Sequence, residues 1–221
     1  MRRFDDLTDY NIYCKHSNFL VACANKILEP QRKKFVVDED NKFVLRFLLY
    51  YFNDCHLAED VFPKKKYKTT KNLLLCGGVG TGKTLLMQVF AEYLRQTRNP
   101  NSFVNISVTQ MINYYKLNGH LNLYTFNESL DSRAFDGKPY NLALNDVGIK
   151  GHVHFGTDTK LIVDDFFHAR NEIWTQYQKF AHFTTNLTPT EVKRHFDDGY
   201  GRLIDRLKTY NVVSLNGTSR R

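Results

Sequence analysis

A glycine-rich segment in the first half of the chain has the residue types that bind phosphate groups. Residues 77–84 read GGVGTGKT and fit the pattern G-x-x-x-x-G-K-[ST] in full. Glycines let successive backbone N–H groups turn inward around an anion, the lysine adds positive charge beside the β- and γ-phosphates, and the threonine hydroxyl can ligate Mg²⁺. This loop is therefore expected to bind a nucleoside triphosphate with Mg²⁺. The residues expected to contact the nucleotide are Gly77, Gly78, Val79, Gly80, Thr81, Gly82, Lys83, Thr84 and Leu85.

Hydrolysis of a bound triphosphate also needs a carboxylate at the end of a neighbouring strand. Two segments offer one, Asn145-Asp146 and Asp164-Asp165. The second follows an apolar run, but apolar residues recur at helical spacing over 160–177, and carboxylates in the first turn of a helix suit its dipole. We therefore expect one helix over 160–177 and the acidic strand end at Asn145-Asp146.

Three further polar residues could read the outer phosphate of a bound nucleotide. Asn186 follows an apolar strand, although asparagine is also common there as a helix cap. Arg202 and Arg206 are four residues apart and so share one face of a short helix. They could simply solvate the surface, or form an arginine finger that reaches the γ-phosphate held by an adjacent subunit.

The patterns around these residues predict the elements that position them. Strands are expected at 72–76, 102–108, 142–144, 179–184 and 211–215. Helices are expected at 10–28, 39–53, 83–97, 111–117, 160–177 and from Thr188, where Pro189 and a capping box with Glu191 mark a helix start. Strands that alternate with helices imply an α/β fold with a parallel sheet covered on both faces.

Composition and charge limit the classes of function. The 221 residues are 42% hydrophobic and 24% charged, which excludes a disordered chain, a collagen and a disulfide miniprotein. The net charge is +8, with +4 in residues 1–71 and +3 in residues 187–221. This positive charge near both ends of the sequence could bind a polyanionic partner such as nucleic acid, or it could simply be a solvated basic surface. The four cysteines lack metal-site spacing, and no membrane span or signal peptide is evident, so we expect a cytoplasmic protein without a membrane partner.

Taken together, these motifs resemble the AAA+ ATPases of the DnaC-like helicase-loader and IstB-like transposition-helper group. The resemblance covers about residues 35–221. It implies a P-loop NTPase with an AAA+ core, a parallel five-stranded sheet flanked by helices, and no large C-terminal lid. The matched segments are residues 73–84, Asn145-Asp146-Val147-Gly148, Thr184-Thr185-Asn186-Leu187, residues 201–207 and residues 217–221.

The resemblance also implies a role for the polar residues near the end of the chain. Asn186 would be sensor 1, and Arg202 or Arg206 would supply the finger in trans. Arg221, with Arg220 as the neighbouring candidate, would be sensor 2 and would contact the nucleotide.

The acidic strand end departs from the family pattern. Asn145 stands where the family has its Mg²⁺-associated aspartate, and Asp146 stands where it has the water-activating acid. With Thr84 these residues form the expected metal site. Asparagine brings no negative charge, so hydrolysis would be slow; alternatively, Asp146 serves the metal and no dedicated base remains.

By the same resemblance, residues 1–34 would be a helical partner-binding segment and residues 35–221 the ATP-binding domain. The partner would be a replicative helicase or a transposase, and copies of the chain would assemble on ATP and on DNA, expected to be single-stranded. The leading expectation is a helicase loader, and the alternative is a transposition helper. A small-molecule phosphotransferase and a nucleotide-gated binding module with negligible turnover are further alternatives.

Overall fold

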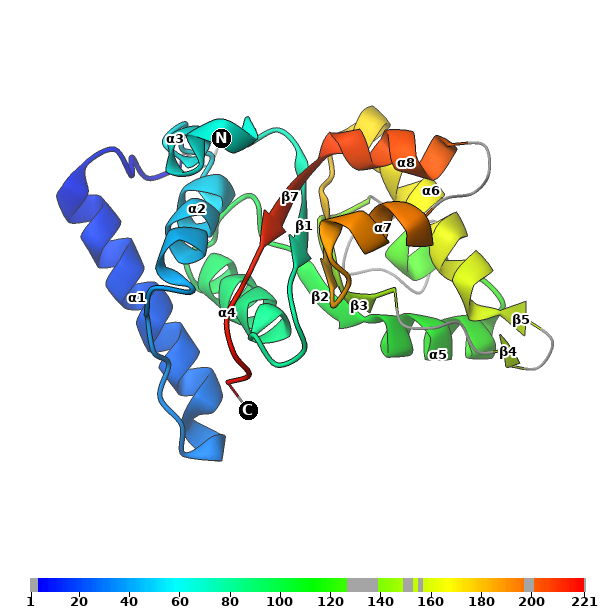
Figure 1. The fold of residues 1–221 in the computed structure, drawn as a ribbon, viewed down its shortest axis with the longest axis horizontal. Helices are drawn as coiled ribbons and strands as arrows, with labels where there is room; N and C mark the ends of the chain where they lie inside the picture. The colour runs from blue at the N-terminus through cyan, green and yellow to red at the C-terminus, as the bar shows by residue number, and fades with distance from the viewer. Residues whose placement is uncertain (1–3, 127–138, 149–152, 155–156, 197–200, 221) are drawn as a thin grey trace.

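In the part of the chain that the structure describes, five parallel strands form the central sheet of the computed structural model (Figure 1). That part comprises residues 4–126, 139–148, 153–154, 157–196 and 201–220. The strands, in the order β2-β3-β6-β1-β7, are β2 (Val104–Ser107), β3 (Leu142–Val147), β6 (Ala181–Thr185), β1 (Asn72–Cys76) and β7 (Tyr210–Ser214). Parallel neighbours need crossover connections, which helices provide here. The expected α/β fold with a parallel sheet between helices is confirmed.

The helices lie before the first of these strands and between the strands. They are α1 (Tyr10–Leu28), α2 (Lys42–Phe52), α3 (Ala58–Val61), α4 (Lys83–Gln96), α5 (Val108–Asn118), α6 (Thr159–Tyr177), α7 (Pro189–His195) and α8 (Arg202–Arg206). Short 3-10 turns are η1 (Glu29–Gln31), η2 (Pro63–Lys65), η3 (Asn122–Tyr124) and η5 (Leu207–Thr209). A separate antiparallel pair consists of β4 (Val153–His154) and β5 (Thr157–Asp158).

Side chains that alternate along β1 divide the interior into two cores, one on each face of the sheet. Leu73 and Leu75 lie in a core with residues of α1, α2 and α4, whereas Leu74 and Cys76 lie in a core with residues of α5 to α8. Figure 1 shows these two groups of helices on opposite sides of the sheet. Removal of apolar surface from water is the main favourable term in folding, so the side chains on both faces of β1 stabilise the packing of the helices on the sheet.

The boundary between β2 and α5 differs from the expected one. The Ser107 hydroxyl accepts a hydrogen bond from the backbone of Gln110, and the Gln110 side chain accepts one from the backbone of Ser107. This capping box ends the strand at residue 107 and begins the helix at 108 rather than 111. The other expected elements are found to within three residues, and α6 is one helix that contains Asp164 and Asp165, as predicted.

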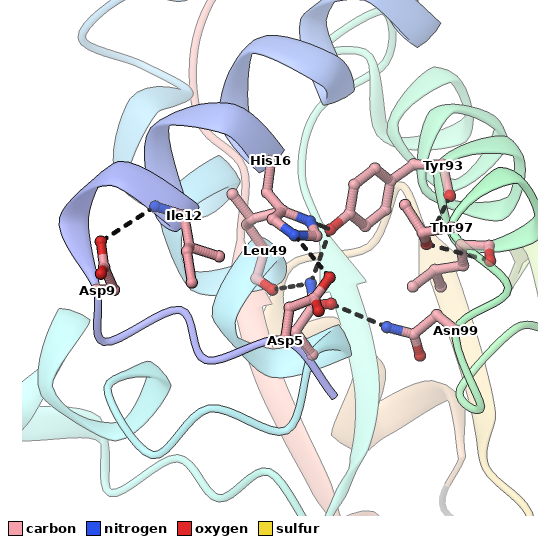
Figure 2. A network of polar contacts seen from close by, with 10 residues as sticks. Asp5, Asp9, Ile12, His16, Leu49, Tyr93, Thr97 and Asn99 are labelled. Atoms are coloured by element: carbon pink, nitrogen blue, oxygen red, sulfur yellow. Dashed lines mark hydrogen bonds and ion pairs between the residues drawn. The ribbon is translucent and has the colours of Figure 1, made fainter. Parts of the chain in front are cut away.

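The N-terminal helix α1 packs directly on α4, the helix that follows the phosphate loop. Figure 2 shows a polar network at this contact, in which His16 is hydrogen-bonded to the Tyr93 hydroxyl. The same hydroxyl accepts a hydrogen bond of 3.0 Å from Asn53 of the loop after α2, and Asp5 lies 3.1 Å from the other nitrogen of His16. The described part of residues 1–34 therefore shares the core of the sheet domain, and the functional division at residue 34 stays a prediction.

The described residues contain no helix with both the length and the apolar composition that a bilayer span requires. All four cysteines are free thiols, and three of them are buried. No group of three His, Cys, Asp or Glu side chains gathers within the described ranges to hold a metal by itself.

Candidate nucleotide-binding site

The glycine-rich loop connects β1 to α4, as its sequence predicted. Gly80 and Gly82 have φ values of +83° and +97°, which residues with a Cβ atom rarely adopt. Gly82 is the residue immediately before α4, a helix of 14 residues whose N-terminal N–H groups face the loop. A helix N-terminus of this kind stabilises phosphate groups through its N–H donors and its dipole.

The C-terminal segment lies along the same loop. The Leu215 N–H donates to the Cys76 carbonyl at 2.7 Å, and the Arg220 N–H donates to the Gly80 carbonyl at 3.0 Å. A Cβ at Gly77 would lie 2.2 Å from the Leu215 carbonyl oxygen, and a backbone atom cannot turn aside as a flexible side chain can. Gly77 is therefore required by the close approach of the chain end.

Lys83 links the loop to the adjacent strand. Its Nζ donates to the carbonyls of Gly77 and Gly78 and to Oδ1 of Asn186, each at 2.8 Å. Asn186 directly follows β6, the strand next to β1, so the two parallel strands end with their polar residues in contact. Only 4% of Lys83 is exposed, and its ammonium lies among oxygen atoms, as a buried positive charge requires.

A cavity of about 580 Å³ opens beside this lysine. One wall is the connection between α1 and α2, where Lys33, Lys34, Phe35 and Val36 line it. The opposite side consists of the phosphate loop and the polar residues at the strand ends. Of the expected nucleotide contacts, those that line the cavity are Gly80, Thr81, Gly82, Lys83, Thr84 and Leu85. Gly77 and Gly78 instead bind Lys83 through their carbonyls, and Val79 is an exposed residue of the loop.

Thr84 and Asp146 both line the cavity, and their hydroxyl and carboxylate are oxygen donors of the kind that Mg²⁺ prefers. Mg²⁺ normally keeps several waters and binds through one or two protein groups plus substrate phosphates, so these two donors fit it without a larger cluster. Asp146 has a φ of +64°, and the pairing of β3 with β6 shifts register between Leu144 and Val147. Asparagine and aspartate tolerate this left-handed conformation better than most residues.

Asn145, the other half of the expected acidic end, is not among the residues that line the cavity. It is buried in the sheet, where its amide contacts β2 and β6. The structure thus brings Thr84, Asp146 and Asn186 to one cavity and leaves Asn145 beneath its surface.

The predicted fingers lie elsewhere. Arg202 is exposed on α8, and Arg206 is half-buried near Tyr210, with its Nη1 buried and without a hydrogen-bond partner in the described residues. Neither residue lines the cavity. Figure 1 shows α8 and α4 on opposite sides of the sheet, so neither arginine belongs to the site of its own chain.

Arg220 lies at the cavity, and Arg221, the expected sensor 2 residue, lies outside the described residues. The Arg220 guanidinium donates to both oxygens of Asp38, at 2.7 and 2.9 Å, and these hydrogen bonds hold the pKa of Asp38 below its usual range. Sequence reasoning missed Asp38 and the wall at Lys33–Val36 altogether. No motif marks them, because they approach the loop only through the packing of α1 and α2.

No protein-family model and no curated protein matches the sequence. Among solved structures, the DnaC helicase loader is similar, with a TM-score of 0.54 and 13% identity over 82% of this chain and 93% of that chain. A putative primosome component from Streptococcus pyogenes serotype M3 has a TM-score of 0.52 and 18% identity over 85% of each chain. The replication initiator DnaA bound to AMPPCP and single-stranded DNA has a TM-score of 0.52 and 19% identity over 83% of this chain.

The chain spans about half the length of that DnaA structure (49%), but most of the loader. At these identities the likeness shows the fold alone, a parallel five-stranded sheet flanked by helices. The resemblance to the DnaC-like group is confirmed at this level.

Proposed function

We propose that this protein binds ATP with Mg²⁺ in the cavity beside Lys83, hydrolyses it, and serves as a DNA-associated assembly factor that loads a replicative helicase. The observation that carries the proposal is the direct contact between Lys83 of the phosphate loop and Asn186 at the end of the adjacent strand, on the edge of a cavity of about 580 Å³. A complete phosphate-binding loop and a polar reader of the outer phosphate meet there, as nucleotide hydrolysis requires.

Each residue of the site has a separate task in this proposal. Lys83 exchanges the carbonyls of its own loop for phosphate oxygens, which are stronger partners because they are charged. Thr84 and Asp146 hold Mg²⁺, which would neutralise charge on the phosphates. Asn186, held against Lys83, orients the attacking water or contacts the γ-phosphate. The wall at Phe35 and Val36 offers apolar surface to the base.

The finger acts between copies of the chain. Arg202 is the better candidate, because it is exposed, whereas one guanidinium nitrogen of Arg206 is buried. An exposed arginine outside its own site can stabilise the transition state only on a neighbouring copy. This geometry supports an ATPase that needs self-association, and it counts against a monomeric phosphotransferase.

The choice of partner is supported by the comparisons. One structural neighbour that aligns over 93% of its length is described as a helicase loader, and another is described as bound to single-stranded DNA. The net charge of +8 suits a DNA partner. No feature of the described residues favours a transposase over a helicase.

The nucleotide part is tested with Lys83→Ala. Loss of the ammonium should weaken ATP binding at least about 100-fold, since it removes a charge-assisted contact to the phosphates. Titration of a fluorescent ATP analogue with and without Mg²⁺ measures this affinity. Lys193→Ala, which removes an exposed lysine of α7, is the matched control and should bind like wild type. Equal affinity of Lys83→Ala and wild type would refute the site.

The partner part is tested by loading. The purified protein and the replicative helicase of the same cell are mixed with circular single-stranded DNA and ATP, and helicase retained on the DNA is measured. We expect retention with wild type and none with Lys83→Ala. Retention of a transposase but of no helicase in parallel samples would replace the loader with the transposition helper.

A further inference from the structure

Asn145 is held by hydrogen bonds on two sides although it lies next to the acid of the proposed site. Its exposed fraction is 2%. Its Nδ2 donates to Oδ1 of Asn105 at 2.7 Å and to the carbonyl of Ile106 at 3.0 Å, both on β2. A backbone carbonyl can only accept, so the Ile106 contact fixes which end of the Asn145 amide faces β2.

The other end of this amide is coupled to Asp146. The Thr184 hydroxyl on β6 donates to Oδ1 of Asn145 at 3.3 Å and accepts from the backbone N–H of Asp146 at 3.0 Å. A chain of hydrogen bonds thus runs from the Ile106 carbonyl on β2 through the Asn145 amide on β3 to the Thr184 hydroxyl on β6. It coincides with the register shift of β3 and with the positive φ of Asp146. A left-handed conformation is less favourable than a right-handed one even for aspartate, so surrounding contacts help to hold it.

An aspartate would fit the space of Asn145 but could not make the same hydrogen bonds. It would place a carboxylate oxygen where the amide N–H₂ now meets the Ile106 carbonyl, and two acceptors repel at 3.0 Å. The Asn105 side chain could rotate to present its own N–H₂, but the Ile106 carbonyl is part of the sheet and cannot. Position 145 therefore requires a donor.

We propose that Asn145 is a positioning residue whose amide holds the bulged end of β3, so that Asp146 alone presents a carboxylate to the cavity. This inference rests on the proposed function for its effect on turnover, but not for its effect on the fold. The family pattern would suggest that asparagine at position 145 slows hydrolysis because it lacks the charge of an aspartate, and this inference gives the opposite result. An aspartate at position 145 lowers turnover rather than restoring a missing metal ligand.

The structural part is tested by thermal unfolding without nucleotide. Asn145→Asp and Thr184→Val should each lower the melting temperature by about 3 °C or more, since each breaks the chain of bonds in the sheet. Thr184→Ser keeps the hydroxyl and should restore most of the loss. Asp146→Asn keeps the backbone N–H and should unfold like wild type. An unchanged melting temperature for Asn145→Asp overturns the proposal, whatever the protein does with ATP.

The functional part separates turnover from affinity. Asn145→Asp should lower kcat at least about tenfold, while ATP affinity measured in EDTA stays within about twofold of wild type, because Lys83 and the loop are untouched. Thr184→Val should behave in the same way, and Thr184→Ser should retain most of the turnover. A rise in kcat for Asn145→Asp overturns the proposal. A wild-type protein that neither binds nor hydrolyses ATP instead refutes the proposed function, and the melting temperatures then decide this inference alone.

Discussion

Arg220 joins the end of the chain to the wall of the cavity through its two hydrogen bonds with Asp38. A second carboxylate, that of Asp40, lies 3.9 Å from the same guanidinium. The guanidinium is thus held by carboxylates at the place where a polyphosphate would enter. Since both partners are partly exposed, the pair by itself contributes little to stability. Its importance lies in competition, because a bound phosphate and Asp38 would attract the same cation.

At the residue scale we expect the two partners of this pair to have opposite effects. Arg220→Ala should weaken ATP binding about tenfold by removing a cation from the cavity, whereas Asp38→Asn should strengthen it about two- to threefold by removing a competing carboxylate. Titration of a fluorescent ATP analogue measures both at neutral pH, where Asp38 is ionised because the ordinary pKa of a carboxyl already lies far below 7 and that of Asp38 is lowered further. Equal weakening by the two variants would mean that the pair only supports the wall of the cavity.

Some strands and helices could be predicted from the sequence more completely than others. β1, the phosphate loop and α4 were predictable because the apolar run, the glycines and the helical spacing are all local signals. The bulge at Asp146 was not, since it depends on the hydroxyl of Thr184 and the amide of Asn145, which meet only across strands. For the same reason no pattern could place Asp38 beside Arg220, 182 residues later in the chain.

The buried His182 on β6 makes the free energy of unfolding depend on pH. Its ring is buried against Phe52 and Phe103, and burial, with the nearby charge of Arg170, lowers its pKa from 6.5 to about 3. Between these values the unfolded chain binds a proton that the folded chain does not, so the free energy of unfolding falls as the pH falls. The upper limit of this loss is about 5 kcal/mol.

We therefore expect denaturant unfolding at a series of pH values below 6.5 to show a steady loss of stability in wild type. His182→Phe should reduce that slope, while His56→Gln, at an exposed histidine, should retain it. The same slope in His182→Phe and wild type would show that another group carries the pH dependence.

The proposed nucleotide cavity and the candidate finger lie at separate places in the molecule. The cavity is lined by the phosphate loop and the start of α4, and Arg202 is the first residue of α8. Figure 1 shows α4 and α8 on opposite sides of the sheet. A site built from two copies would make hydrolysis depend on assembly, and each copy would contribute a different half.

At this scale complementation provides the sharpest test. Arg202→Ala should bind ATP like wild type and lose at least about 100-fold of its hydrolysis, as expected for a finger. Mixing it with Lys83→Ala, which keeps Arg202, should restore part of the rate, because a competent site then forms between unlike copies. A mixture no more active than its parts, together with a wild-type rate per molecule that is independent of protein concentration, would contradict a shared site. Lys208→Ala, which removes an exposed lysine just after α8, is the matched control and should hydrolyse ATP like wild type.

We expect the loop at Lys83 to hold the phosphates of ATP, and a crystal structure with a non-hydrolysable ATP analogue and Mg²⁺ would show the bound phosphates themselves. We predict the triphosphate against the loop, the Nζ of Lys83 on a phosphate instead of the carbonyls of Gly77 and Gly78, and the metal beside Thr84 and Asp146. An empty loop at a saturating concentration of the analogue, with Lys83 still bound to those carbonyls, would contradict the account.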